Sequence, residues 1–284
     1  MTIAAPAKLN LRLLVGLRRA DGYHPLRTLL AALDGLEDAV TVIPSAGRSV
    51  ICPGIEGAEN LAWRALDALE EEVGRPLPVR VEIDKRIPAQ AGLGGGSSDA
   101  AAALVGADRM LRLGLGPERL ERVSARVGSD VPFFVRGGAQ WAEGRGERLR
   151  PAEVAPFAVV LAMPPTGLST AEVYRAFDRL PPPPPAEVLA RSRNEGAYHD
   201  LLARSRNDLW PAALALAPRL GATARALAAA GADAVLLCGS GSCVAGLFPD
   251  REAAEAGAAR LPEGGFRAVA TGPAAPRGAV SGRS

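Results

Sequence analysis

The stretch PAQAGLGGGSSDAAAAL, residues 88–104, constrains this chain most, because it joins a glycine-rich turn to an alanine-rich helix. Glycines let backbone N–H groups approach an anion closely, and a helix start adds unpaired donors and a positive dipole end. A helix that begins at Ser97 or Ser98 also places two hydroxyls where they can bond phosphate oxygens or magnesium. The stretch therefore predicts a nucleotide site, although a plain glycine turn stays open for this stretch alone.

Two common nucleotide motifs do not match this stretch. The P-loop, G-x-x-x-x-G-K-[ST], needs a lysine before its hydroxyl residue, and Ser97 follows Gly96 instead. The G-x-G-x-x-G pattern, counted from Gly92, needs a glycine where Ser97 stands. A doubly wound dinucleotide-binding fold is therefore disfavoured.

The order of the expected elements favours α+β architecture. Helix 60–74 has Asn60 as its N-cap and stops at Gly74, and helix 169–180 opens with Ser169 and Glu172 in capping-box spacing. Strands and helices mix without regular βαβ alternation, which favours α+β over a doubly wound sheet. The other expected elements are strands 39–43, 79–84, 157–163 and 266–271, helices 117–128 and 250–260, and a strand–turn–strand unit over 232–248.

The length of 284 residues allows two moderate domains with real cores. We expect an ATP-binding domain over 1–152, a C-terminal substrate domain over 153–271 and a disordered tail over 272–284. Five consecutive prolines, 181–185, predict a stiff extended connector inside the second domain.

Composition excludes several classes of protein. A net charge of +2 predicts no polyanion-coating surface, so nucleic acid is not an expected partner. The three cysteines lack metal-ligand spacing and two histidines are too few for a histidine-based zinc site, which favours reduced thiols in a cytoplasmic protein. No apolar run approaches the roughly 20 residues of a membrane helix, so we expect no membrane partner.

Three further segments carry polar residues in apolar surroundings. Alternation along the N-terminal strand puts Lys8 and Asn10 on one face, opposite Leu9 and Leu11. Asp130 lies in GSDVPFF, residues 128–134, between a helix end and an expected apolar turn. CGSGSC, residues 238–243, is a second glycine–serine turn between strands. These segments favour a site, although a surface ion pair would also explain Lys8 and Asp130.

Residues 88–98 have the pattern P-x-x-x-G-L-G-G-G-S-S. Through this pattern the chain resembles the galactokinase, homoserine kinase, mevalonate kinase and phosphomevalonate kinase superfamily. Within it, the chain is most similar to the 4-diphosphocytidyl-2-C-methyl-D-erythritol kinases, and the likeness runs from about residue 3 to 271. The stretches that carry this likeness are PAKLNL, ADGYHPL, IDKRIP, LGGGSSDAAA, GSDVPFF and RNDL. The resemblance implies an N-terminal domain like ribosomal protein S5 domain 2, a ferredoxin-like C-terminal domain and ligands between them.

The resemblance also implies a reaction. The ATP γ-phosphoryl group would pass to the 2-hydroxyl of a cytidine-diphosphate-linked methylerythritol in the non-mevalonate route to isoprenoids. Asp130 would accept the hydroxyl proton, and Lys8 would keep that carboxylate ionised and offset charge on the moving phosphoryl group. Magnesium would arrive with ATP, its protein ligands unknown. The triphosphate would be wrapped by Pro88, Ala89, Gln90, Ala91, Gly92, Leu93, Gly94, Gly95, Gly96, Ser97 and Ser98.

Substrate contacts follow from the same resemblance. Tyr23 and His24 match positions that hold the cytosine ring by stacking and by edge hydrogen bonds, and Tyr174 matches a second aromatic, unless it is a core tyrosine. Asn10 and Thr170 are further substrate candidates. Asn60 is a candidate adenine contact, although its capping role alone would explain it. The resemblance leaves a monomer or a homodimer open.

Two positions depart from the family pattern, and the sequence also allows other functions. Cys238 stands where Ser or Thr is common, and Trp210 follows RNDL where an acidic residue is usual. The alternatives are another small-molecule kinase of the superfamily, for mevalonate or homoserine, or a nucleotide-binding regulator without catalysis. ADGYH favours a cytosine pocket, and a regulator would need Lys8 or Asp130 lost.

Overall fold

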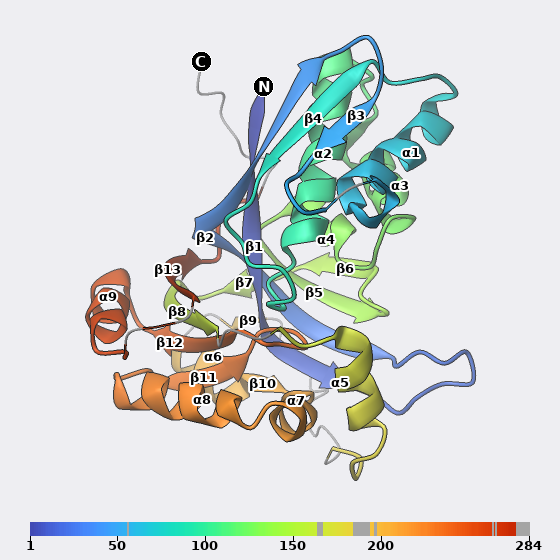
Figure 1. The fold of residues 1–284 in the computed structure, drawn as a ribbon. Helices are drawn as coiled ribbons and strands as arrows, with labels where there is room; N and C mark the ends of the chain where they lie inside the picture. The colour runs from blue at the N-terminus through green and yellow to red at the C-terminus, as the bar shows by residue number, and fades with distance from the viewer. Residues whose placement is uncertain are drawn as a thin grey trace.

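The computed structural model describes residues 1–55, 57–163, 167–183, 194–195, 198–262, 264 and 266–276, and they form a mixed α and β structure (Figure 1). Two long antiparallel strands, β1 (Thr2–Val15) and β2 (Leu26–Pro44), run through its centre. Eleven of the described strands form one sheet, with the main order β10-β1-β2-β13-β8-β12-β11. The sheet therefore takes strands from both the N-terminal and the C-terminal half of the chain.

The N-terminal half packs helices against one side of this sheet. Its longest helix, α2 (Gly95–Leu111), is buried along most of its length and contacts β1 and β2. The alanines and small residues of α2 allow this close approach: a Cβ on Gly106 would lie 2.5 Å from Val42 Cγ2. The other elements of this half are β3 (Ser49–Ile51), η1 (Gly57–Glu59), α1 (Leu61–Val73), β4 (Val79–Asp84), α3 (Gly116–Ala125), α4 (Val131–Arg136), β5 (Ala139–Gly144) and β6 (Arg148–Pro151).

The C-terminal half is built on strands β8 (Phe157–Met163), β12 (Val244–Phe248) and β13 (Phe266–Gly272). Helices α8 (Arg219–Ala229) and α9 (Arg251–Ala259) pack against them and bury Leu220 and Leu227, among others. The remaining elements are β7 (Glu153–Val154), α5 (Thr170–Phe177), β9 (Asn194–Glu195), α6 (Tyr198–Arg204), β10 (Arg206–Asn207), α7 (Trp210–Leu216) and β11 (Ala234–Leu237).

These elements confirm the expected α+β class, because helices and strands alternate irregularly around one mixed sheet. The expected strands and helices are all present, and Asn60 caps α1 by accepting from the Ala62 backbone N–H while Gly74 ends it at φ 69°. Local signals were sufficient here because caps and periodicity act within one element.

Four expectations need correction. Helix α2 begins at Gly95, before the expected Ser97, and the apolar stretch after Asp130 is helix α4 rather than a turn. Ser169 precedes α5 but its side chain makes no capping hydrogen bond, so the predicted capping box is wrong. The tail begins later than Gly272: that residue ends β13, and Ala274 N–H donates to the Ala32 carbonyl at 2.8 Å.

Some expectations fall partly outside the described residues, namely prolines 184–185 and the tail over 277–284. Within the part of the chain that the structure describes, no helix is long and apolar enough to cross a membrane. Cys52, Cys238 and Cys243 are buried and form no disulfide. Trp210 begins α7 and packs, partly buried, against the C-terminal core, which gives this unusual residue a structural explanation.

Backbone hydrogen bonds join the glycine loop, residues 88–98, to both halves. Lys8 N–H in β1 donates to the Leu93 carbonyl at 2.9 Å. From the turn over 238–243, Ser242 N–H and Cys243 N–H donate to the carbonyls of Gln90 and Ala91, both at 3.1 Å. The glycine loop is therefore a connection between the domains as well as a candidate phosphate site.

Gly92 is the position where this connection tolerates no side chain. Its φ is +76°, and a Cβ there would lie 1.7 Å from the Cys238 carbonyl oxygen. We predict that Gly92→Ala lowers the free energy of unfolding by at least about 3 kcal/mol, measured by urea titration, because both the backbone and the contact are strained.

Gly96→Ala is the matched control in the same loop, because Gly96 is helical and a Cβ there would only approach Leu61 Cδ1 at 3.6 Å. This variant should unfold within about 1 kcal/mol of the wild type, with helix propensity in its favour. Equal stability of the two variants would contradict the claim that a side chain at position 92 cannot fit against the Cys238 carbonyl.

Candidate active site

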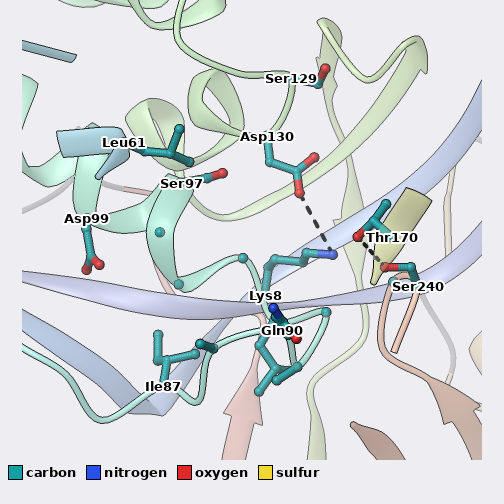
Figure 2. Close-up of a pocket in the computed structure, with 18 of the residues that line it drawn as sticks. Lys8, Leu61, Ile87, Gln90, Ser97, Asp99, Ser129, Asp130, Thr170 and Ser240 are labelled. Carbon is teal, nitrogen blue, oxygen red and sulfur yellow. Dashed lines mark hydrogen bonds and ion pairs between the residues drawn. The ribbon is translucent and has the colours of Figure 1, made fainter. Parts of the chain in front are cut away.

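A cavity of about 710 Å³ lies where the two halves meet. The glycine loop supplies residues 88–97 to its lining, and β1 supplies Lys8 and Asn10. Asp130 lies across from them, while Thr170, Tyr174 and Ser240 line it from the C-terminal half. The structure thus gathers most of the predicted site residues around one space (Figure 2).

The glycine loop ends in an open helix N-terminus that faces this cavity. Gly94 occupies the N-cap of α2 at φ 74° and has no side chain to cap the helix. The first N–H groups of α2 are therefore left for an anion, which the helix dipole also favours. Ser97 lines the cavity, whereas the neighbouring Ser98 is fully buried and its Oγ has no hydrogen-bond partner.

Lys8 and Asp130 form an ion pair across the cavity. Lys8 Nζ lies 4.0 Å from Asp130 Oδ2, and Figure 2 shows the ammonium directed at the carboxylate. The Lys8 side chain is 5% exposed and that of Asp130 42%, so the pair has one buried and one accessible partner. A surface ion pair does not describe this arrangement, because Lys8 is held inside the protein.

Asn10 orients Lys8. Its Oδ1 accepts from Lys8 Nζ, and its Nδ2 donates to Thr28 Oγ1 at 2.8 Å, which in turn donates to the Arg12 carbonyl. Lys8 and Asn10 therefore share a face, as expected from strand alternation. Gly239 in the second turn also approaches, since a Cβ there would lie 3.1 Å from Lys8 Nζ.

A buried charge cluster that the sequence did not reveal lies behind the glycine loop. Lys85 forms ion pairs with Asp38 and, at 2.7 Å, with Asp99. The Asp38 Oδ1 also accepts from the backbone N–H groups of Arg86 and Ile87, at 2.6 and 2.8 Å. Asp38 thereby fixes the chain just before the loop. The available signal was Asp99, a single charged residue before the alanine run of the helix, whereas Lys85 is one of three consecutive charged residues and does not stand out.

Burial dominates the electrostatics of this cluster. It raises the pKa of Asp99 to about 7, against the lowering effect of the Lys85 ammonium, and Asp38 adds to the rise. Burial acts to lower the pKa of Lys85, but the two carboxylates outweigh it and the pKa is raised. Two carboxylates thus share one firmly protonated lysine.

The end of the cavity beyond Asp99 is lined by Cys52, Ile55, Asn60 and Leu61. The Asn60 side chain is committed to structure: Oδ1 caps α1 and Nδ2 donates to the Ile55 carbonyl at 3.4 Å. Its capping role is therefore observed, and an adenine contact remains a prediction.

At the opposite end, Thr170 Oγ1 lies 2.8 Å from Ser240 Oγ, joining α5 to the second turn (Figure 2). Tyr174, on the next turn of α5, lines the cavity, and burial followed by the Asp130 charge raises its pKa to about 12. Its hydroxyl is therefore neutral at ordinary pH.

Tyr23 and His24 do not line the cavity itself but lie at its margin. Tyr23 is 53% exposed. The His24 ring lies 5.3 Å from the Tyr174 ring and has both nitrogens engaged, Nδ1 with the Gly16 carbonyl at 2.9 Å and Nε2 with Asp178 at 3.1 Å. Both ring nitrogens of His24 therefore have protein partners here, and the edge contact of this ring with a base remains a prediction.

The RNDL stretch supports the second turn. Asn207 Nδ2 donates to the carbonyls of Leu237 and Gly239, at 2.8 and 2.7 Å. Asp208 Oδ2 accepts from the Val15 backbone N–H at 3.0 Å. This stretch therefore ties the turn to β1 without itself contributing a charged group to the cavity.

Comparison with known proteins places this geometry in a family. The family models for the GHMP kinases N terminal domain and the GHMP kinases C terminal match residues 60–138 and 186–266. The 4-diphosphocytidyl-2-C-methyl-D-erythritol kinase of Geobacter sp. (strain M21) is 41% identical over 268 residues, which cover 92% of this chain and 94% of the relative.

Solved structures agree with this placement. A crystal structure of 4-(cytidine 5'-diphospho)-2C-methyl-D-erythritol kinase matches with a TM-score of 0.78 and 36% identity, covering 96% of this chain and 100% of the other. A homoserine kinase from Cytophaga hutchinsonii matches with a TM-score of 0.70, covering 91% of this chain and 88% of the other. At 18% identity the latter shows the fold alone.

The buried carboxyl of Asp99 predicts a pH-dependent stability. A carboxyl whose pKa is higher in the folded than in the unfolded chain stabilises the fold while protonated, and that contribution is lost as the pH rises through the folded value. For Asp99 the loss runs from about pH 4 to about pH 7. The amide introduced by Asp99→Asn does not titrate. The unfolding free energy of this variant therefore does not fall through ionisation at position 99.

The unfolding free energy of Asp99→Asn relative to the wild type should therefore rise across this window, by on the order of 1–3 kcal/mol. Urea unfolding of both proteins at about pH 4.5 and at about pH 7.5, near the two ends of the window, measures the change. A difference that stays constant or falls with pH would contradict the raised pKa.

Proposed function

Because the chain belongs to the GHMP kinase family and, within it, to the 4-diphosphocytidyl-2-C-methyl-D-erythritol kinases, we propose the following function for its site. The enzyme transfers the γ-phosphoryl group of ATP to the 2-hydroxyl of 4-(cytidine 5'-diphospho)-2-C-methyl-D-erythritol. The products are the 2-phosphate and ADP, in the non-mevalonate route to isoprenoid precursors. Within the site, the meeting of Lys8 and Asp130 beside the open N-terminus of α2 carries the assignment.

Asp130 is the general base in this proposal. As the acceptor oxygen bonds to the γ-phosphorus, its proton passes to an Asp130 carboxylate oxygen, and the bond to the β–γ bridging oxygen breaks to release ADP. Lys8 stabilises the negative charge of the carboxylate and of the phosphoryl group in flight. Phosphoryl transfer depends mainly on positioning and electrostatics, so a lysine oriented by Asn10 is suited to it.

The glycine loop holds the triphosphate in this proposal. Residues 88–98 bring backbone N–H groups to the phosphates, and the cavity lining around Asn60 and Ile55 receives the adenosine. The cluster of Asp38, Lys85 and Asp99 keeps the loop entrance fixed. Lys85 also provides a cation near the nucleotide.

Magnesium fits this site through hydroxyl groups. Among the residues that the structure describes, no group of three histidines, cysteines or carboxylates could hold a metal. Ser97 lines the cavity, and the buried Ser98 Oγ beside it lacks a partner. These hydroxyls would complete the coordination of an ion carried by ATP, which when bound neutralises phosphate charge.

The acceptor occupies the other end of the cavity. Tyr23 and Tyr174 stack on the cytosine ring, and His24, beside the Tyr174 ring, holds the cytosine by edge hydrogen bonds. These bonds replace one of the two contacts that the His24 ring makes with the Gly16 carbonyl and Asp178. Thr170 contacts the substrate from the start of α5. Asn10 acts mainly through Lys8.

We further place the enzyme in the cytoplasm as a monomer or homodimer that does not act on nucleic acid. Three buried cysteines without a disulfide suit a reducing compartment. The small net charge of +2 does not favour binding to a polyanion.

Substrate choice tests the function directly. The purified enzyme is incubated with Mg-ATP and, separately, the cytidylyl substrate, mevalonate or homoserine, and ADP release is measured. We expect release with the cytidylyl substrate alone. Release with mevalonate or homoserine instead would overturn the specific assignment, and no release with any alcohol would favour a regulator without catalysis.

Removal of the proposed base gives the second test. Asp130→Asn should lower turnover by roughly 10²–10⁴-fold, the usual scale for loss of a general base. The affinity for ATP, measured by calorimetry, should change little because Asp130 lies across the cavity from the glycine loop. Full turnover in this variant would remove Asp130 from the mechanism.

A further inference from the structure

Arg145 is a cation of the cavity that the reaction described above does not use. It lies in the turn between β5 and β6 and lines the cavity together with Gly146. Its guanidinium carbon lies 3.9 Å from the centre of the Tyr23 ring, and Nη2 lies 3.5 Å from Asp21 Oδ2. The side chain is 49% exposed. It therefore stands at the margin where the acceptor enters, free to change partners at little cost.

The other cations of the cavity are already committed. Lys8 is bound to Asn10 and paired with Asp130, and Lys85 is held between two buried carboxylates. Among the described residues, the Arg145 side chain contacts the face of the Tyr23 ring and makes a long contact with the exposed carboxylate of Asp21. Among the described residues that line the cavity, it is thus the arginine or lysine best able to accept a new anion.

The turn also fixes where Arg145 lies relative to the chemistry. Gly146 packs against the start of α4: a Cβ there would lie 3.6 Å from Ser129 Cβ and 4.0 Å from Asp130 Oδ1. Glu147 braces the turn by accepting from the Arg145 backbone N–H at 2.6 Å. Arg145 is therefore anchored between the proposed base and Tyr23.

That interval is the one an acceptor must cross. If the cytosine lies on Tyr23 and the reacting hydroxyl at Asp130, the diphosphate that links them lies between, beside Arg145. A guanidinium suits this group because its planar fork donates two parallel hydrogen bonds to phosphate oxygens. In the proposed function the nucleotide donor is held elsewhere, by the glycine loop, which lines the cavity across from Asp130.

We propose that Arg145 binds the diphosphate of the acceptor and thereby selects a nucleoside diphosphate conjugate over a bare alcohol. This assignment rests on the proposed function. It makes Arg145 a binding residue for the acceptor, with its stack on Tyr23 as the resting arrangement.

Binding of cytidine 5'-diphosphate and of cytidine, each measured by calorimetry without ATP, tests the proposal. The wild type should bind the diphosphate more tightly than the nucleoside. Arg145→Gln should lose about 10–100-fold in affinity for the diphosphate, the scale of charge-assisted hydrogen bonds, and much less for cytidine. Arg145→Lys should fall between, because it keeps the charge but not the fork.

Arg148→Gln is the matched control, an exposed arginine of the same hairpin that does not line the cavity. It should keep the wild-type ratio of the two affinities. In steady-state assays Arg145→Gln should raise the KM for the cytidylyl substrate about 10–100-fold, again the scale of charge-assisted hydrogen bonds, with the KM for ATP unchanged.

The outcomes separate the two proposals. An unchanged ratio of diphosphate to cytidine affinity in Arg145→Gln, with the wild type binding both, would overturn the role of Arg145 and leave the function intact. A raised KM for ATP with an unchanged KM for the acceptor would also overturn it. Failure of the wild type to bind either cytidine compound would overturn the proposed function and this assignment with it.

Discussion

The backbone contacts between the glycine loop and the turn over 238–243 decide the geometry on which the rest of the site depends. Gln90 and Ala91 accept hydrogen bonds from that turn, and Leu93 accepts one from β1. The loop thus has the central strand on one side and the C-terminal half on the other. Gly92 permits this approach because it brings no side chain against the Cys238 carbonyl. The open N-terminus of α2, which we propose binds the phosphates, is thereby held in a fixed position relative to groups from both domains.

The positions of the charged side chains around the cavity depend on this connection of the glycine loop to both halves. Lys8 reaches the cavity from a buried strand and is aimed by Asn10, while Lys85 is confined behind the loop by Asp38 and Asp99. Both lysines are held before any ligand arrives, which reduces the reorganisation that phosphoryl transfer would otherwise require. Arg145, in contrast, is on a turn and half-exposed, as expected of a group that exchanges partners when an acceptor binds.

Much of the fold could be predicted from the sequence because its signals are local, whereas the meeting of Lys8 and Asp130 was predicted only through the family resemblance. Helix α1 carries its own cap and stop, and Lys8 and Asn10 share a face through strand alternation. What could not be predicted depends on contacts between distant residues: Asp38 meets Lys85, and Arg145 covers Tyr23. The contacts of the two His24 nitrogens with Gly16 and Asp178 could not be predicted for the same reason.

A crystal structure with a non-hydrolysable ATP analogue and the cytidylyl alcohol would show both ligands in this cavity. We expect the phosphate tail to lie on the N–H groups at the start of α2 and the 2-hydroxyl to lie within hydrogen-bond distance of an Asp130 carboxylate oxygen. Phosphates bound away from residues 92–98, or an acceptor hydroxyl out of reach of Asp130, would contradict this arrangement.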